Sequence, residues 1–377
     1  MKFVDKLLGK SNSYNYYKNN YEKIGKKYKK SIKEIKKLKN ENTILNKNLS
    51  SSYDEIIKLQ KRLGKFSKPI IMKKLIDEEY SDLTIAIKTP NPVGHHHWGD
   101  YFFAVALKKS FEKRGFNVLI HERENWYDTS VDVDINFFLR GKYEWDPSYD
   151  SINIMWNIYD PEKVTKEEYE KYDICFISSI KYAENLSKNV NTIIKPLLQC
   201  TDPDIFYPEY DDSITEDILF VGSTRGVYRK IIKDIMETDF DVAVYGRGWP
   251  EFIDKRYEKG FFIPNEELHK YYSSCKILLN DHWESMRELD FPSNRLFDAL
   301  ACGTFVISDK IPSAETLFEG TIVTYDDKDD LNEKLDYYLT HDEERIKMVE
   351  KGKEIVLKHH TFDNRVDEIL NELKCLF

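Results

Sequence analysis

The feature that most constrains the fold of this chain is an alternation of short apolar runs with amphipathic segments, which begins near residue 82. Residues 83–89 (LTIAIKT) and 116–121 (FNVLIH) have the pattern of buried strands. Between them, residues 100–115 (DYFFAVALKKSFEKRG) have helical spacing and end at a glycine. Strands that alternate with helices predict a parallel sheet with helices on both faces. Three further strand-like runs continue the pattern, at 133–139, 151–157 and 173–179.

The same alternation restarts after a segment rich in proline and aspartate, residues 199–212. Strands are predicted at 217–223, 240–248, 276–281 and 304–309, with helices between them and a helical tail after residue 329. We therefore expect an α/β protein with two tandem Rossmann-like domains, preceded by an α-helical coiled coil. The predicted divisions are a basic coiled-coil segment at 1–66, a first Rossmann-like domain at 67–200, a second Rossmann-like domain at 201–345, and C-terminal helices at 346–377 that pack back across the cleft between the domains.

The N-terminal segment carries a heptad pattern. Counting sevens from Tyr21 and from Ile24 gives two mostly apolar series, at positions a and d, over about six heptads. Asn42 falls at a, where asparagine typically fixes register and strand number. Such a helix has little core of its own, so we expect a homo-oligomer through this coiled coil. The alternatives are a single helix on the body or a helix bound to another protein, and Ser52 with Glu55 forms a capping box that could start a second helix.

The charge is divided unevenly along the chain. Residues 1–66 hold 18 Lys and Arg against 6 Asp and Glu, whereas the remainder holds 39 against 60. The acidic body argues against nucleic-acid binding. The basic N-terminus could make a peripheral contact with an anionic membrane, or its lysines could simply solvate a long helix. Five scattered cysteines without a CxxC pair, and no visible signal peptide or apolar span, predict a cytoplasmic protein or one on the cytosolic face of a membrane.

Two common nucleotide-binding fingerprints are missing. Neither GxGxxG nor GxxxxGK[ST] occurs after a predicted strand, which disfavours a dehydrogenase and a P-loop NTPase. Ligands of doubly wound sheets lie beyond the carboxyl ends of the strands. With two such units, we expect the site in the cleft between them.

Residues 291–309 (FPSNRLFDALACGTFVISD) describe a helix aimed at such a site. Pro292 and Ser293 start the helix and Gly303 stops it. A helix start offers free N–H groups and a positive dipole end, which suits a phosphate, and Arg295 adds a forked cation there. Asp298 lies one turn further on, with Asp290 eight positions before it.

Residues 294–309 resemble the donor-site segment of group 1 glycosyltransferases with the GT-B fold, closest to the spore-maturation-protein-like branch. That family carries two carboxylates with seven residues between them, and here Asp290 and Asp298 keep the spacing with Asp in place of Glu. The resemblance implies that Asp298 contacts the ribose of a nucleotide-sugar and that Asp290 lies by the sugar. It extends over residues 200–310 in family order, through CTDPDIFYP, ILFVGSTRGVYRK, VYGRGWP and PNEELHKYYSSCKILLN. The donor-binding residues that it implies are Gly222, Arg225, Arg229, Lys230, Gly246, Arg247, Asn294, Arg295 and Asp298.

The acceptor side is predicted at NPVGHHHWGD, directly after the first strand. Asp100 or a neighbouring histidine, His97 foremost, would act as general base on an acceptor hydroxyl, with Asp290 as the third catalytic candidate. The alternative for Asp100 is a helix N-cap. Adjacent histidines point in different directions and lack a partner pair at helical spacing, so we expect no metal, and no cofactor besides the nucleotide-sugar substrate.

The predicted function is therefore a glycosyltransferase that uses a nucleotide-diphosphate sugar and a glycan, lipid-linked or protein acceptor. The Asp290–Asp298 spacing favours retention at the anomeric carbon, and Gly99-Asp100 favours inversion, so the stereochemistry stays open. The alternatives are a non-catalytic coiled-coil scaffold with a degenerate site and a nucleotide-sugar epimerase on the same fold.

Overall fold

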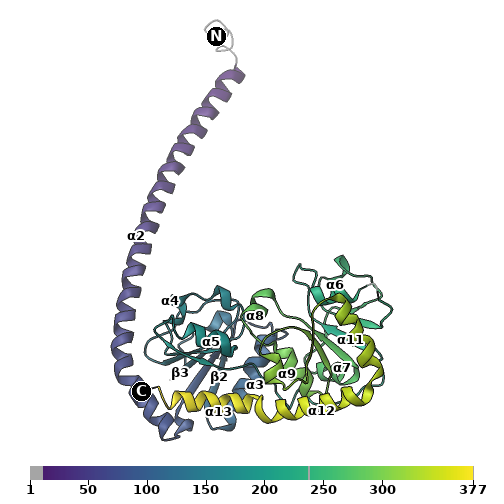
Figure 1. Cartoon of the computed structure of the whole chain (residues 1–377). Helices are drawn as coiled ribbons and strands as arrows, with labels where there is room; N and C mark the ends of the chain where they lie inside the picture. Colours follow the sequence, from purple (N-terminus) through teal and green to yellow (C-terminus); the bar gives the residue numbers. More distant parts are fainter. Residues whose placement is uncertain (1–11, 237, 377) are drawn as a thin grey trace. The chain divides into compact units, whose positions relative to one another are not determined.

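A computed structural model describes residues 12–236 and 238–376 (Figure 1). The chain divides into two compact units, residues 1–63 and residues 64–377, and each is considered by itself. Residues 1–11 of the predicted N-terminal segment lie outside the described residues. None of the helices in the described ranges is both long and apolar enough to cross a membrane.

Helix α2 (Asn12–Ile76) is continuous over 65 residues, so a second helix does not begin at Ser52. The residues before Ser52 are already helical, so Ser52 lies inside the helix and does not act as its N-cap. Toward its end the helix changes character, since Ile71, Met72 and Leu75 are buried in the core that covers the first sheet. These three residues anchor the last turns of α2 to the body.

The first sheet is parallel and six-stranded, in the order β2-β1-β3-β4-β5-β6. The five predicted strands are confirmed, and β6 was not predicted. Chain order changes direction between β1 and β3, which is the switch point where open α/β sheets bind ligands. The strands are β1 (Thr84–Lys88), β2 (Asn117–His121), β3 (Ile135–Arg140), β4 (Ile152–Asn157), β5 (Ile174–Ile177) and β6 (Ile193–Pro196), and the α-helices among them are α3 (Gly99–Lys113), α4 (Lys166–Tyr169) and α5 (Ile180–Leu186).

The second sheet is also parallel and six-stranded, in the order β12-β11-β10-β7-β8-β9. This is the doubly wound order, with its switch point between β7 and β10. The strands are β7 (Ile218–Val221), β8 (Val242–Tyr245), β9 (Glu258–Gly260), β10 (Ile277–Asn280), β11 (Val306–Asp309) and β12 (Val323–Tyr325). The α-helices are α6 (Lys230–Ile235), α7 (Leu268–Ser274), α8 (Glu284–Glu288), α9 (Asn294–Ala301), α10 (Ala314–Leu317), α11 (Lys328–Thr340), α12 (Asp342–His359) and α13 (Phe362–Leu373).

The last two helices pack against helices that belong to different sheets. Helix α12 packs against α9, whereas α13 returns to α3 beside the first sheet (Figure 1). Phe362, Val366 and Ile369 of α13 are buried in the first core, together with Phe103 and Trp156. The end of the chain therefore completes the core of the first sheet.

Candidate functional site

The loops that follow β7 and β8 are held together by glycines. Gly246 has φ +147°, and a Cβ built there would lie 2.3 Å from the carbonyl oxygen of Gly222. A Cβ on Gly248, at φ +87°, would meet Thr224 Oγ1 at 2.3 Å. Trp249 Nε1 donates to the Gly222 carbonyl at 2.8 Å. A larger residue at Gly246 would clash with backbone, and one at Gly248 would displace the Thr224 side chain, so the two glycines allow the loops to approach closely.

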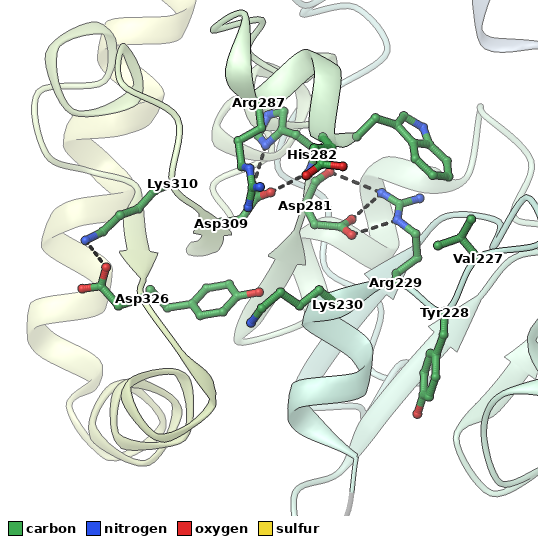
Figure 2. A pocket seen from close by; sticks show the side chains of 13 residues that line it. Val227, Tyr228, Arg229, Lys230, Asp281, His282, Arg287, Asp309, Lys310 and Asp326 are labelled. Carbon is green, nitrogen blue, oxygen red and sulfur yellow. Dashed lines mark hydrogen bonds and ion pairs between the residues drawn. The ribbon is translucent and has the colours of Figure 1, made fainter.

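The loop after β10 contributes a buried ion pair. Arg229, directly before α6, donates from Nε to Asp281 Oδ2 at 2.8 Å and from Nη2 to Asp281 Oδ1 (Figure 2). Both residues are buried. The resemblance implies Arg229 as a donor-binding residue, but in the structure its charge is matched by a carboxylate that lies 52 residues further along the chain.

His282 joins three elements of the second sheet. Its Nδ1 lies 2.6 Å from Asp309 Oδ1 at the end of β11, and its Nε2 accepts from the Ser293 N–H at 2.9 Å, just before α9. Since Nε2 accepts from the Ser293 N–H, Nδ1 is the ring nitrogen that donates to Asp309. His282 thereby ties the start of α9 to the ends of β10 and β11.

A cavity of about 590 Å³ opens beside these groups, over the carboxyl ends of β10, β11 and β12 (Figure 2). Lys230 lies on one side of it, with Nζ 5.3 Å from the Tyr325 ring centroid, and pairs with Asp234. Lys310, on the other side, pairs with Asp326. The lining residues are Val227, Tyr228, Arg229, Lys230, Asp281, His282, Trp283, Glu284, Arg287, Asp309, Lys310, Tyr325 and Asp326.

Helix α9 starts at Ser293 and is followed by Gly303 at φ +74°, as predicted. Arg295 in its first turn donates from Nη1 to Asn280 Oδ1 at 2.7 Å, and its Nη2 lies 3.3 Å from where a Cβ of Gly222 would stand. The cation is thus set directly against the loop after β7. Its partner is the amide oxygen of Asn280, which leaves its charge uncompensated by that contact.

Asp298 is buried inside the second turn of α9. Thr201 Oγ1 donates to its Oδ1 at 2.8 Å, and Asn294 Nδ2 donates to its Oδ2 at 2.7 Å. Burial raises the pKa of Asp298 to about 8, while the two hydrogen bonds act in the opposite direction. In this structure the carboxyl group joins α9 to the segment between the two sheets.

Asp290 is buried eight positions earlier, in the left-handed region at φ +61°. Its Oδ1 accepts from the backbone N–H and the hydroxyl of Ser313, at 2.9 Å and 2.7 Å. The carboxylate therefore holds the turn before α10. The two aspartates keep the predicted spacing, and each has protein groups as its partners.

The first sheet presents a carboxylate at the start of α3. The N-cap of α3 is Trp98 and Asp100 stands in the first turn, so the interpretation of Asp100 as the N-cap residue is wrong. Its Oδ1 lies 3.7 Å from where a Cβ of Gly141 would stand, at the end of β3. Burial raises the pKa of Asp100 to about 6, against the opposing charge of Arg225.

Arg225 comes from the loop after β7 and reaches groups of the first sheet. It has φ +52° and donates to the hydroxyl of Tyr159, which follows β4. Its guanidinium carbon lies 5.2 Å from the Tyr159 ring centroid and 5.6 Å from that of Trp283. A cation of the second sheet and the Asp100 carboxylate of the first are thereby brought within electrostatic reach of each other.

Of the three consecutive histidines, His95 and His97 have their ring centroids 5.5 Å apart, whereas His96 turns to other partners. His96 stacks on Tyr101 at 4.1 Å between ring centroids, and its Nε2 lies 3.1 Å from Glu122 Oε1. His97 is exposed, with its ring 6.5 Å from that of Phe262. Within residues 12–236 and 238–376, no three His, Cys, Asp or Glu side chains are grouped closely enough to hold a metal ion.

Comparisons with known proteins agree with this architecture. Residues 225–371 match a family model described as glycosyl transferase-like. The spore protein CgeB of Bacillus subtilis (strain 168) is 26% identical over 169 residues, which are 41% of this chain and 52% of that protein. The alignment thus spans about half the length of this curated relative.

Solved structures extend the comparison to both sheets. Sucrose-phosphate synthase from Thermosynechococcus elongatus superposes with a TM-score of 0.60 at 13% identity, over 78% of this chain and 99% of that one. HepE from Anabaena, in complex with UDP and glucose, gives 0.53 at 10% identity over 77% and 100% of the two chains. The fold is GT-B. An α-glucosyltransferase in complex with UDP-glucose and DNA gives a TM-score of 0.56 at 13% identity, over 77% of this chain and 99% of that one. The family match and this fold confirm the resemblance to glycosyltransferases that the sequence showed.

Seven of the twelve predicted site residues fall into three groups. Gly222, Gly246 and Arg295 surround the loop after β7, Asp100 and Arg225 converge from the two sheets, and Arg229 and Lys230 line the cavity. Arg247 is exposed beside the first group, and its N–H donates to Ser223 Oγ at 3.1 Å. Asp290, Asp298 and Asn294 hold protein groups, and His97 stands apart on the surface.

Sequence reasoning did not select Tyr159, Asp281, His282 or Asp309. Their position could have indicated them, because each residue follows or ends an apolar run that is predicted to be a strand. Polar residues at the carboxyl ends of parallel strands are the ones that a doubly wound sheet offers to a ligand.

Proposed function

We propose that this protein is a glycosyltransferase that moves a sugar from a nucleotide-diphosphate sugar to a hydroxyl acceptor. The family match over residues 225–371 and the GT-B fold support this class of reaction. Two solved structures with this fold hold UDP or UDP-glucose. The observation that carries the proposal is the convergence of Arg225 and Asp100, which brings a cation for a diphosphate toward a carboxylate poised to act as a base.

The proposed donor site is the loop after β7 with the start of α9. Gly222 lets backbone approach a diphosphate closely, and Arg225 and Arg295 supply charge from two directions. As the bond between the sugar and the diphosphate breaks, negative charge grows on the leaving group. Fixed cations and the dipole end of α9 stabilise that charge without reorganisation.

Arg229 takes a different role from the one that the sequence predicts. Its ion pair with Asp281 is buried, so removing either partner would leave an unpaired charge. We assign it to shaping the loop and the wall of the cavity, and assign the diphosphate to Arg225 and Arg295. Ribose contact by Asp298 stays a prediction, and it requires Thr201 or Asn294 to release one carboxyl oxygen.

The proposed base is Asp100. With a pKa of about 6 it is ionised at neutral pH and still basic enough to take a proton. It removes the proton of the acceptor hydroxyl as that oxygen attacks the anomeric carbon and the nucleoside diphosphate leaves. This single displacement inverts the anomeric centre, so we favour inversion over retention.

A donor screen tests the proposal. Purified protein is incubated with UDP-, GDP-, ADP-, CMP- and dTDP-sugars, and thermal stabilisation and nucleotide release are both measured. We expect one base to stabilise the protein and to be released slowly by hydrolysis when no acceptor is present. The anomer released at early times, measured by proton NMR, distinguishes inversion from retention.

A matched pair of variants locates the site. Arg225→Gln should lower nucleotide release tenfold or more, a loss of at least ~1.4 kcal/mol of transition-state stabilisation. Lys233→Gln on the exposed side of α6 removes the same charge away from the site and should change nothing. If no donor stabilises the folded wild-type protein, the non-catalytic scaffold is the better interpretation.

A further inference from the structure

Helix α2 exposes an apolar stripe along one side. Within its described side chains, the heptad residues Ile24, Tyr28, Ile35, Leu38, Leu45, Leu49, Leu59 and Leu63 are between 53% and 70% exposed. The stripe follows the a and d positions counted from Tyr21 and Ile24. Beyond Leu63 the burial pattern changes, because Ile71, Met72 and Leu75 pack into the body. Ile70, at the next a position, is still 61% exposed, so the stripe runs up to the residues that pack into the body.

We propose that this stripe is the interface of a parallel, in-register, two-stranded coiled coil with a second copy of the chain. The occupant is argued from charge. Ten lysines lie between residues 22 and 52, and eight of them occupy the outward b, c and f positions. Only Lys27 and Lys39 flank the a/d stripe. A basic helix that keeps eight of these ten lysines off the stripe brings few like charges together where an identical helix meets it.

The flanking positions also match a parallel pair. In that arrangement a g residue faces the e residue of the next heptad in the other helix. Glu34 then faces Lys39 of the second copy, and Glu41 faces Asn46. Between residues 22 and 52, this register places no two like charges opposite each other. The pairing of Glu34 with Lys39 therefore favours this register, and no like-charged pair between residues 22 and 52 opposes it.

The residues of the seam specify strand number. In the central heptads Ile35 stands at a, and Leu38 and Leu45 stand at d, a combination that favours two strands. The neighbouring a positions hold Tyr28 and Leu49. Asn42 occupies the a position between Leu38 and Leu45 and is exposed in the single chain. In register, it faces Asn42 of the second copy, where the two amides can hydrogen-bond to each other. A shift of the register by one heptad would instead place each amide against Ile35 or Leu49, without a hydrogen-bond partner.

The oligomeric state of the full-length chain is the first test. Sedimentation equilibrium of the wild type at micromolar concentration should give twice the 44.8 kDa monomer mass. Leu45→Lys should raise the dimer dissociation constant at least ~100-fold, equivalent to ~2.8 kcal/mol. The control is Ile44→Lys, because Ile44 is 60% exposed, next to Leu45 at 65%, but occupies the outward c position. It should leave the dimer intact.

Cysteine cross-linking tests orientation. In a Cys375→Ser background, where the four remaining cysteines are buried, Ser31→Cys and Ser52→Cys are each introduced alone at d positions. Both variants should form a disulfide with their own second copy. In an antiparallel pair that brings residue 31 opposite itself, the two copies of residue 52 lie roughly 60 Å apart at 1.5 Å per residue, beyond any disulfide.

Each result decides the proposal. A wild-type monomer would overturn it and point to the helix of a different protein, and a trimer or tetramer would overturn the two-stranded state. A dimer in which only one of the two cysteine variants cross-links would overturn the parallel register. A dimer that Ile44→Lys dissociates as readily as Leu45→Lys would remove the stripe as its interface.

Discussion

At the scale of single residues, burial raises the pKa of two carboxyl groups that lie in different surroundings. Asp100 and Asp298 are aspartates whose pKa values burial raises, to about 6 and about 8. They differ in their surroundings, because Asp100 faces a cation at the end of the first sheet whereas Asp298 is hydrogen-bonded to Thr201 and Asn294. The first arrangement suits proton transfer, and the second suits a structural link.

Asp100→Asn should reduce turnover by ~10²- to 10⁴-fold, the usual contribution of a general base. In the wild type, activity should fall as pH drops through about 6, because Asp100 then gains a proton and no longer accepts one. The measurement is a pH–rate profile of nucleotide release with the donor found in the screen. Asp132→Asn, at an exposed carboxylate, is the control. An acid limb that persists in a still active Asp100→Asn variant would assign the base elsewhere.

Asp298→Asn should change the pH dependence of stability. The folded pKa of about 8 exceeds the ordinary value of 3.8, so the folded chain retains a proton that the unfolded chain has released. The free energy of unfolding of the wild type therefore falls as pH rises from about 4 to about 8. The variant lacks this titration, and its melting temperature relative to wild type should rise across that window. A constant difference between pH 4 and pH 8 would contradict the raised pKa.

At the scale of elements, the site depends on how closely the loops after β7 and β8 approach. Their contact is backbone to backbone at Gly222 and Gly246, so no side chain can be trimmed to relieve a clash. The His282 link from Asp309 to Ser293 adds a second constraint, from the other side of the switch point. The loop after β7 is thereby fixed by neighbours on both sides.

Gly246→Ala should destabilise the protein by ~2 kcal/mol or more, since it combines a forbidden backbone conformation with a 2.3 Å approach to the Gly222 carbonyl oxygen. Gly226→Ala is the matched control. It also has a positive φ, +80°, but nothing lies within 4 Å of its Cβ position. It should cost only ~1 kcal/mol. Chemical denaturation of both variants checks this, and equal losses would show that strain alone, rather than the close approach, sets the cost.

At the scale of the whole body, α13 makes the last residues of the chain part of the first core. It follows α12, which packs on the second half, so the two final helices bind different sheets. The segment that joins the sheets is held at the same place, where Thr201 pairs with Thr361 and Arg365 Nε donates to the Leu198 carbonyl at 2.7 Å. Stability of the first sheet is therefore tied to the C-terminus.

Ile369→Ala should lower the free energy of unfolding by ~2–5 kcal/mol, because Ile369 is fully buried in the first core. Ile346→Ala on α12 is the control. Its side chain is 53% exposed, and the same deletion should cost less than ~0.5 kcal/mol. Urea denaturation followed by tryptophan fluorescence compares them, with Trp156 of the first core as a reporter. Similar losses in the two variants would contradict the packing of α13.

The sequence by itself determined the architecture, because apolar periodicity reports burial and burial selects strands and helices. The central strands of both sheets, the long α2 and the boundaries of α9 follow from it. Strands β6, β9 and β12 are not predicted from the sequence, because weak burial leaves a weak apolar pattern. Each lies at the edge of its sheet and is only partly buried, so its residues carry no continuous apolar run.

Only the tertiary structure decided which partner each charged side chain meets. Arg229 is matched by Asp281, Asp298 by Thr201, and Asp100 by the charge of Arg225, across separations of 52, 97 and more than 100 residues. Residue type and local spacing show that a side chain is charged and near a strand end. Whether that charge is free for a ligand depends on the distance to partners elsewhere in the chain, and on how far burial strips both of water.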